Sequence, residues 1–388
     1  ESSRFAEIKT SRRWGETMSI IDFSEEQSML LETANEFCRE NSTMSVVRAQ
    51  IDKDESIDAE LWSRIVELGW LGVSIPEAYG GLGMGLAGAV PIVESMGKYL
   101  MGSPYTSCIL GSEAMLSCAS EEQKNEWLPK IVEGAVATIA LTEEDGNWRL
   151  EEISSRAEKD GESLVLSGSK CFVLDAPMAD LFVISVILEG EPRFVLAKGD
   201  QVDAERLTRE NVIDETRRSY RFELDGLVIP ESQLLEGADF SRIEMAAMLM
   251  LVAEMSGGLS GVLHVIIDYL TTRKQFDKYI GSYQSLKHPT VQILLSQEAC
   301  RSHLYHAATQ ITENSADAIS AIRMAKAQGA EAFSFAGDRA VQFHGGFGFT
   351  YECDAQLFLR RALWCQYQFG DSAYHNELLA PLLLDEVV

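Results

Sequence analysis

The stretch VQFHGGFGFTYECD at residues 341–354 decides the fold when it is considered together with TTRKQFDKYIGSYQSLKH at residues 271–288. In the later stretch, the paired glycines Gly345 and Gly346 allow backbone N–H groups to approach a phosphate or a ribose without a clash from a Cβ atom. In the earlier stretch, Arg273 offers a planar cation of the kind that binds a pyrophosphate. Either stretch alone is also compatible with a capped helix end followed by a loop, so the prediction of a nucleotide site depends on their combination.

Composition and charge exclude several classes of protein. Of the 388 residues, 46% are hydrophobic and 24% are charged, which is ordinary for a soluble globular protein. The net charge of −27 argues against nucleic acid and anionic membranes as partners, and no apolar run reaches the ~18 residues of a membrane span. The seven cysteines lack CxxC spacing and no HExxH motif is present. We therefore predict a protein of the reducing cytoplasm with neither a disulfide framework nor a metal site.

The period of the apolar residues changes twice along the chain. It is helical at first, and Ser24 followed by Gln27 is typical of a capping box. The period then becomes two residues, in short β-branched and aromatic runs that turn residues bound. This pattern predicts a compact antiparallel β domain. Long helical segments follow. The predicted parts are a leader or added segment at 1–17, an N-terminal helical domain at 18–135, a middle β domain at 136–237 and a helical bundle at 238–388.

These segments together resemble the acyl-CoA dehydrogenase family over nearly the whole chain from about residue 22. LGWLGVSIPEAYGGLG at residues 68–83 resembles its N-terminal signature, and LTEE followed by LSGSKCFVLDAPMADLFVISV resembles its middle β domain. The resemblance implies an α+β fold with an N-terminal helical domain, a middle antiparallel β domain and a C-terminal four-helix bundle. It also implies FAD as cofactor and the removal of two hydrogens from the α and β carbons of a CoA thioester.

The C-terminal motifs HGGFGFTYE-D, LRRA and GD-AYH are most similar to one subgroup of this family. That subgroup includes the small, non-catalytic β-type subunits of heteromeric bacterial dehydrogenases that act on bulky acyl-CoA esters, steroid side chains among them. In homodimeric family members, residues matching this motif set reach the FAD of the neighbouring subunit. The resemblance thus implies an FAD shared at a subunit interface, with these contacts in this chain: Arg273, Gln275, Phe276, Gln284, Gln342, Gly345, Gly346 and Phe172.

The other half of the flavin site departs from the family pattern. The family usually has TEP-x-x-GSD where this chain has TEEDGNW, so that Asn147 and Trp148 replace a small Gly-Ser pair. The family motif K-x-W-I-T appears as KCFVL at residues 170–174. Phe172 can still stack on a ring, whereas Leu174 replaces a threonine whose hydroxyl bonds the flavin in the family.

The carboxylate base of the family is also absent. Removal of an α proton needs a carboxylate within reach of that carbon. The two positions at which the family keeps this glutamate correspond to Phe369 and to Ala247, which lies twenty-six residues before Arg273. Glu244, one turn before Ala247 on the same helical face, and Asp371 are outside candidates for a substitute. Glu254 and Glu352 are further carboxylates, and a structural or solvent-facing role is expected for them.

We therefore expect a subunit of a heteromeric FAD-dependent acyl-CoA dehydrogenase that lacks its own base. It would pair with a homologous catalytic chain in a heterotetramer with two copies of each, and complete the FAD site of that partner. The acyl-CoA substrate would bind to the partner, and an electron-transfer flavoprotein or a similar acceptor would take the electrons. Two alternatives stay open: a self-sufficient homotetrameric enzyme that uses Glu244 or Asp371 as base, and a flavin-free structural or binding homologue.

Overall fold

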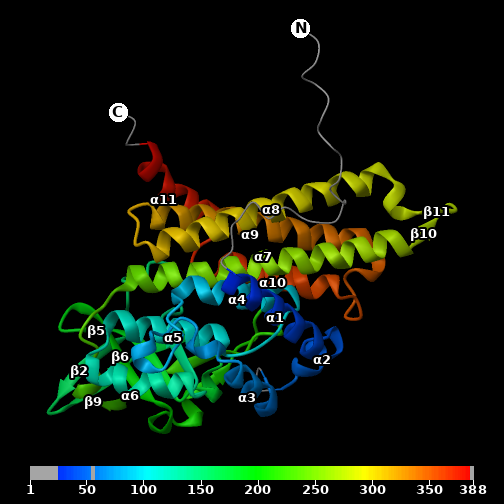
Figure 1. Ribbon diagram of the computed structural model, residues 1–388. Helices are drawn as coiled ribbons and strands as arrows, with labels where there is room; N and C mark the ends of the chain where they lie inside the picture. Colours follow the sequence, from blue (N-terminus) through cyan, green and yellow to red (C-terminus); the bar gives the residue numbers. More distant parts are fainter. Residues whose placement is uncertain (1–24, 54–56, 385–388) are drawn as a thin grey trace.

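The structure is a computed structural model that describes residues 25–53 and 57–384. The predicted capping box begins at Ser24 and the predicted leader covers residues 1–17, so both lie outside these ranges. Along the described chain, short helices come first, then strands, then long helices, which confirms the predicted α+β fold class. Figure 1 shows the long helices running roughly parallel to one another, with the strands and the N-terminal helices beneath them.

Six α-helices form the N-terminal part, and local sequence signals set their ends. The side chain of Asp58 accepts a hydrogen bond from the N–H of Leu61 at 2.8 Å. Ser120 and Gln123 form a complete capping box at the start of the last helix. Trp70, only 1% exposed, lies in the core beneath these helices. The helices are α1 (Glu25–Asn41), α2 (Met44–Gln50), α3 (Ala59–Glu67), α4 (Gly85–Lys98), α5 (Tyr105–Cys118) and α6 (Glu121–Val132).

The middle part of the chain contains two β-sheets. Their strands are β1 (Ala137–Ala140), β2 (Arg156–Asp160), β3 (Ser163–Ser167), β4 (Ser169–Leu174), β5 (Leu181–Leu188), β6 (Glu191–Lys198), β7 (Leu207–Arg209), β8 (Ser219–Glu223) and β9 (Leu227–Pro230). The larger sheet has the order β1-β5-β2-β3-β9 with β6 paired to β5, and the smaller one has the order β4-β8-β7. Most pairs are antiparallel, as predicted. The exception is β5, which pairs in parallel with β1 and β2, because the chain crosses over before it enters this strand.

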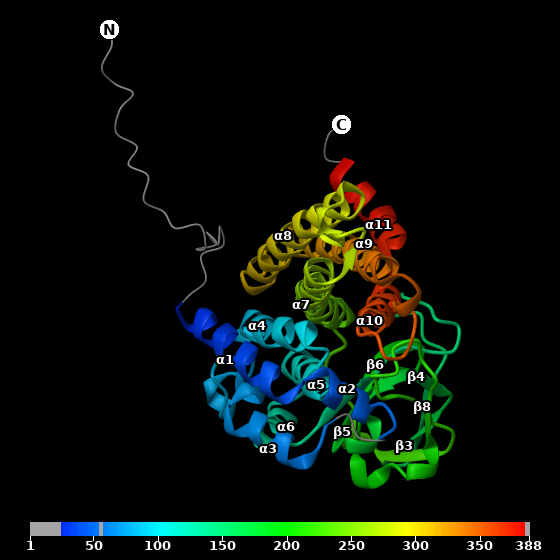
Figure 2. The same cartoon turned by 90° about the vertical axis from the view of Figure 1, so that its right-hand side faces the viewer.

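Long helices make up the C-terminal part. They are α7 (Phe240–Thr272), α8 (Gln284–Thr312), α9 (Ala318–His344), α10 (Ala355–Tyr367) and α11 (Ser372–Leu384), and a short hairpin of β10 (Lys274–Gln275) and β11 (Lys278–Tyr279) joins α7 to α8. In Figure 2, which looks along the bundle, α7 lies between the N-terminal helices and the other long helices. The bundle therefore has α7 as its central element, and α7 contacts both halves of the helical structure.

The backbones of α4 and α7 approach each other closely at two glycines. A Cβ atom at Gly257 would lie 1.8 Å from the carbonyl oxygen of Glu94. A Cβ atom at Gly97 would lie 2.2 Å from the carbonyl oxygen of Glu254. Because no side chain fits at either place, this contact fixes the position of α7 along α4 and the face that α7 turns toward the β domain.

By length and composition, α7 could cross a membrane, which was not expected from the sequence. Its most apolar window has a mean hydropathy of 1.6, and 72% of that window is buried inside the protein. Burial of this extent is what the core helix of a folded domain shows. The side chains of α7 are thus already covered by the surrounding helices and the β domain.

Candidate functional site

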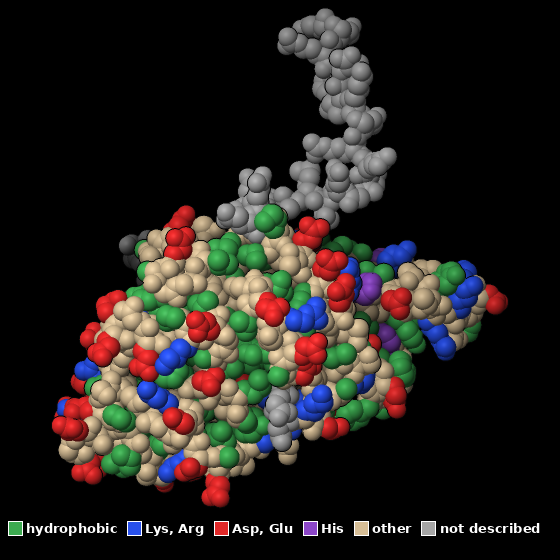
Figure 3. All heavy atoms as spheres, turned by 60° about the horizontal axis from the view of Figure 1, so that its bottom comes forward, with side chains coloured by type: hydrophobic (Ala, Val, Ile, Leu, Met, Phe, Trp, Pro, Cys, Tyr) green, Lys and Arg blue, Asp and Glu red, His purple; other side chains and the backbone are tan. Residues whose placement is uncertain are grey.

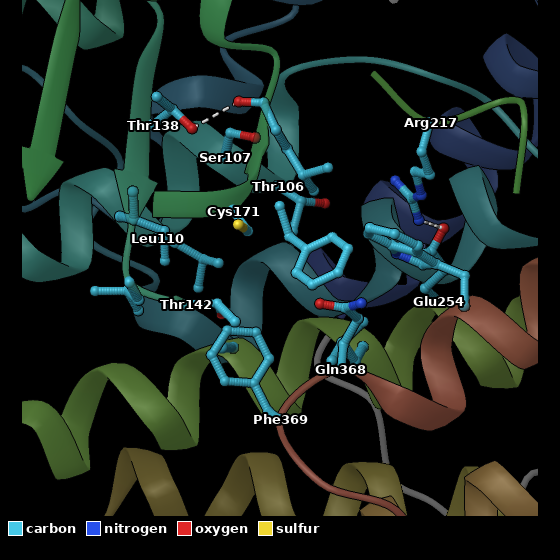
Figure 4. A pocket seen from close by; sticks show the side chains of 17 residues that line it. Thr106, Ser107, Leu110, Thr138, Thr142, Cys171, Arg217, Glu254, Gln368 and Phe369 are labelled. Carbon is cyan, nitrogen blue, oxygen red and sulfur yellow. Dashed lines mark hydrogen bonds and ion pairs between the residues drawn. The ribbon is translucent and has the colours of Figure 1, made fainter. Parts of the chain in front are cut away.

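A pocket lies between the β domain, α5, α7 and the connection from α10 to α11 (Figure 4). Its wall is mostly apolar and includes Leu110, Ile139, Leu141, Leu174 and Leu251. The space inside it that is open to the centres of water molecules is ≈ 70 Å³. Pockets that hold small molecules usually measure ~300–1,000 Å³, so this one has room only for a small group.

The pocket brings together the two positions at which a base was sought in the sequence. Ala247, Leu251 and Glu254 follow one another on one face of α7 and line the pocket from that side. Phe369 lines it from the α10–α11 connection, and Figure 4 shows its ring pointing toward Thr142. The wall therefore has a methyl group and a phenyl ring at these two positions.

Glu254 is the carboxylate in the wall of this pocket. It forms ion pairs with Arg217 and with Arg361, and Arg361 also pairs with Asp214. Figure 4 shows the contact between Arg217 and Glu254. Burial raises the pKa of Glu254, but the two guanidinium groups outweigh this and hold the pKa below its ordinary value. A carboxylate held ionised in this way is a weak base.

Glu244 lies one turn before Ala247 on α7, but its side chain pairs with α9 and does not line the pocket. Both of its carboxylate oxygens accept from Nη2 of Arg323 on α9, at 3.1 and 3.2 Å. Burial raises the pKa of Glu244, although the Arg323 guanidinium opposes the shift.

The other two candidate carboxylates have local roles. Asp371 accepts a hydrogen bond from the N–H of Tyr374 at 2.9 Å and thereby caps the start of α11. Glu352 is exposed in the α9–α10 connection. Neither side chain lines the pocket.

Phe172 and Leu174 line the pocket from β4. The strand has a bulge between Lys170 and Val173, and Phe172 adopts a positive φ of 56° within it. The Phe172 ring meets the ring of Trp364 edge-on at 5.8 Å. Leu174 exposes only its aliphatic side chain to the pocket, since its carbonyl accepts from Thr138 Oγ1 at 2.7 Å.

Trp148 packs against the same α10–α11 connection from outside. Its Nε1–H donates to the carbonyl of Tyr367 at 3.0 Å, and its ring lies 5.2 Å from the ring of Tyr374. Asn147 donates to the carboxylate of Glu152 at 2.7 Å. Asn147 and Trp148 are bulky and already hydrogen-bonded, and they occupy positions where a flavin would need small residues. With the small pocket and the hydroxyl-free Leu174, they do not fit a flavin in this chain.

The predicted nucleotide contacts lie at the opposite end of α7. Arg273 is the C-cap of this helix, and twenty-six residues separate it from Ala247, which corresponds to about 39 Å along the helix axis. Arg273, Gln275 and Phe276 are exposed in the β10–β11 hairpin, with Phe276 87% exposed. Gln284 begins α8 directly after the hairpin and is also exposed. These side chains are too far away to serve the pocket of their own chain.

The glycine-rich stretch lies beside this hairpin. The ring of His344 at the end of α9 stacks on the ring of Tyr269 at 4.1 Å, one turn before Arg273. Gln342, just before His344, and Gly345 and Gly346, just after it, lie at the surface. Gly345 takes φ 62° and ψ −140°, a conformation that suits glycine. The two stretches that suggested a nucleotide site thus meet at one end of the bundle, whereas Phe172 lies at the pocket.

Exposed aromatic rings surround this end of the bundle. Of these rings, only Phe276 was singled out in the sequence. Their exposed fractions run from 47% to 87%: Phe276, Tyr279, Phe347, Phe349 and Tyr351. In Figure 3, Lys and Arg side chains gather on the hairpin, although acidic side chains dominate much of the visible face. Lys274 and Lys278 are the exposed lysines of this hairpin. Exposed rings beside clustered cations are typical of a contact surface.

Comparison with known proteins agrees with the motifs. The family model of the acyl-CoA dehydrogenase N-terminal domain matches residues 24–135, and that of the C-terminal domain matches residues 234–384. The acyl-CoA dehydrogenase fadE12 of Mycobacterium tuberculosis (strain CDC 1551 / Oshkosh) is 30% identical over 311 residues, which are 76% of this chain and 80% of that protein.

Two solved structures share the fold. A variant of the Tcur3481-Tcur3483 steroid ACAD is 25% identical with a TM-score of 0.84, over 93% of this chain and 98% of that one. The ChsE4-ChsE5 complex from Mycobacterium tuberculosis contains a chain that is 23% identical with a TM-score of 0.85, over 93% and 98% of the two chains. At that identity, the second match shows the fold alone.

Proposed function

The chain belongs to the acyl-CoA dehydrogenase family, and we propose that it is the subunit of a heteromeric member that does not carry the catalytic base. The family consists of flavoprotein oxidoreductases that act on acyl-CoA thioesters. In this proposal, a homologous partner chain holds the FAD, the acyl-CoA and the glutamate that removes the α proton. This chain completes the partner's FAD site from the far end of its bundle.

The observation that carries the proposal is the chemistry of the pocket wall. Ala247 and Phe369, at the two base positions of the family, face one pocket and neither can accept a proton. The carboxylate present, Glu254, is neutralised by two guanidinium groups. General-base catalysis needs a carboxylate whose pKa and position suit the proton that is removed. The pocket therefore supports a chain that leaves this step to its partner.

The far end of the bundle supports the second half of the proposal. Arg273, Gln342 and the paired glycines lie together and exposed, roughly 39 Å along α7 from their own pocket. An arginine can form a two-point contact with a pyrophosphate, and glycine N–H groups can approach a phosphate. A nucleotide held by a second chain can reach these groups, so a shared FAD gives them a function that this chain alone does not.

Two further aspects belong to the same proposal. One structural neighbour is the Tcur3481-Tcur3483 steroid ACAD, which favours a bulky acyl-CoA ester as substrate and a heteromeric assembly. The cysteines in the described chain are free and buried, which suits a reducing cytoplasm. An electron-transfer flavoprotein or a similar protein would accept the electrons from the complex.

The local geometry disfavours a self-sufficient homotetramer. Its base would have to be Glu244, which pairs with Arg323, or Asp371, which caps α11. A flavin-free structural homologue would give no reason for an exposed arginine, glutamines and paired glycines to meet at one end of the bundle.

Expression of the chain alone and with each homologous acyl-CoA dehydrogenase encoded beside it tests the proposal. The chain alone should be colourless at the flavin absorption bands and inactive. With the correct partner, a yellow complex should form that oxidises an acyl-CoA ester in the presence of an artificial electron acceptor. A chain that alone binds one FAD per subunit and is bleached by an acyl-CoA ester would contradict the proposal and favour the homotetramer.

A further inference from the structure

We propose that Phe369 is a plug that closes this chain's own pocket, and that Lys326 and Trp148 clamp the loop carrying it. The loop is the α10–α11 connection at residues 368–371, and the last two residues of α10, Gln366 and Tyr367, form its base. This inference concerns the isolated chain and goes beyond the proposed function, which assigns the chemistry to a partner. In this proposal, Lys326 and Trp148 are positioning residues that hold the Phe369 ring in the pocket.

The loop takes a backbone conformation that needs outside support. Phe369 has a positive φ of 55°, which is uncommon for a bulky residue. Gly370 follows with φ 100°, and a Cβ atom there would lie 2.3 Å from the ring of Tyr374 and 2.9 Å from Nε2 of His375. Two successive left-handed residues turn the phenyl ring into the pocket rather than outward. Conformations of this kind persist only where the surroundings hold them.

Lys326 holds the loop from inside. It lies on α9, is fully buried, and its Nζ donates to the carbonyls of Gly370 at 2.6 Å and Gln366 at 3.2 Å. Within residues 25–53 and 57–384, no carboxylate lies within ion-pair distance of this ammonium. A buried amine is costly unless its donors are used, so these carbonyls are what keeps Lys326 inside. Burial also lowers the pKa of Lys326 to about 8.

Trp148 holds the loop from outside. Its Nε1–H donates to the carbonyl of Tyr367, two residues before the plug. Ser334 of α9 adds a fourth contact by donating to Oε1 of Gln366 at 2.8 Å. The clamp therefore joins two carbonyls at the end of α10 and one in the connection to α9 on one side and to the residues after β1 on the other.

The position of the ring explains why the pocket is small. Phe369 faces Ala247 and Leu251 of α7 and shares the wall with Phe172 and Leu174 of β4. With the clamp closed, the ring occupies space that a ligand would otherwise enter. We infer that the clamp keeps acyl thioesters out of a pocket that has no base to use them.

Cys171 provides a native reporter of the plug. It lines the pocket, is 8% exposed, and burial raises the pKa of its thiol to about 11. Cys300, buried in α8 outside this wall, serves as an internal reference in the same molecule. The purified full-length chain is treated with iodoacetamide, and mass spectrometry follows the labelling of each cysteine over time.

Three variants open the plug in different ways: Phe369→Ala removes the ring, Lys326→Met removes the inner clamp, and Trp148→Phe removes one donor. In Lys326→Met, which removes two hydrogen bonds, Cys171 should be labelled at least about tenfold faster. Phe369→Ala removes the ring itself and should give an increase at least as large. Trp148→Phe should give a smaller increase. Cys300 should be labelled at the wild-type rate in all three.

Lys98→Met is the matched control, because Lys98 is another lysine whose pKa burial lowers but which does not touch the loop. It should leave the labelling of Cys171 unchanged. Unchanged Cys171 labelling in Phe369→Ala would overturn the plug, as would equal acceleration of Cys171 and Cys300 in Lys326→Met. If Lys326→Met does not fold, Phe369→Ala and Trp148→Phe decide the outcome.

Discussion

Ala247 on α7 and Phe369 in the α10–α11 connection line the same pocket from two different elements. In the sequence they lie in separate motifs, each matching a position where the family keeps a glutamate. Their meeting means that this pocket lacks a base from either direction. The carboxylate in the wall of this pocket, Glu254, forms buried ion pairs with Arg217 and Arg361.

Glu244→Gln should leave the activity of the assembled enzyme nearly intact. If Glu244 were the base, its loss should lower the rate by at least the ~10²–10⁴-fold typical of general-base catalysis. The variant should instead lower the free energy of unfolding by ~1–3 kcal/mol, since Arg323 keeps a buried cation without its partner. Steady-state rates of the complex and urea unfolding of the chain measure the two effects.

Asp371→Asn is the companion variant for the second candidate base. Asparagine caps a helix about as well as aspartate, so both activity and stability should stay close to wild type. A large loss of rate with intact assembly, in either Glu244→Gln or Asp371→Asn, would show that the catalytic base lies on this chain.

Arg273→Ala should weaken the retention of FAD by the complex, even though this chain holds no base. A charge-assisted hydrogen bond contributes roughly 1.5–3 kcal/mol, which equals about a ten- to hundredfold change in affinity. Added FAD should restore part of the flavin content by mass action. Arg273→Lys should recover some charge but not the two-point contact. The flavin-to-protein ratio after gel filtration gives the measurement.

Lys278→Ala controls for charge alone, because Lys278 lies in the same exposed hairpin. It should change the flavin content little. Equal losses in both variants would point to general attraction of an anion, and no loss in Arg273→Ala would remove the main support for a shared cofactor.

The ion pair of Glu143 and Lys170 should make the chain sensitive to acid. Lys170 is fully buried and its Nζ lies 2.7 Å from Oε1 of Glu143. Burial raises the pKa of Glu143, but the ammonium and the N–H of Ser155 outweigh it and lower the pKa to about 2. The folded pKa thus lies below the unfolded value of 4.5. This contribution to stability is present above about pH 4.5 and is lost as pH falls toward 2.

Glu143→Gln should therefore remove this part of the pH dependence and lower stability at neutral pH, by about 3 kcal/mol or more, because Lys170 stays buried without a counter-charge. Urea unfolding between pH 3 and pH 7 compares the variant with wild type. Glu144→Gln is the control, since its pair with Arg221 is largely exposed. Parallel stability profiles for Glu143→Gln and wild type would refute the assignment.

Arg361→Met should destabilise the chain strongly. Arg361 is fully buried and pairs with Asp214 and Glu254, so its loss leaves two buried carboxylates with Arg217 as their one shared cation among the described ion pairs. Breaking a buried pair in this way costs about 3–5 kcal/mol. Arg360→Met, one residue away, breaks only a half-exposed pair with Glu215 and should cost less than ~1 kcal/mol. Similar unfolding midpoints for the two variants would show that the buried network adds no stability.

The sequence by itself determined the fold class and one end of the site. Changes of apolar period predicted helices, then strands, then long helices, because side-chain periodicity is a local property of each element. Arg273, Phe276 and the pair Gly345–Gly346 stood out because helix ends and glycine turns are set by nearby residues. These groups lie at the surface, where packing against distant parts of the chain does not cover them.

Tertiary structure alone decided how the pocket is built. It placed Phe369 against the face of Ala247, turned Glu244 toward Arg323, and gave the buried Lys326 its partners in a loop of the next helical hairpin. It also paired β5 in parallel with β1 and β2. Each of these contacts joins residues distant in the chain, and their meeting depends on how whole helices and sheets pack. Local preference cannot specify that packing, because the free energy that fixes it comes from burial shared among many elements.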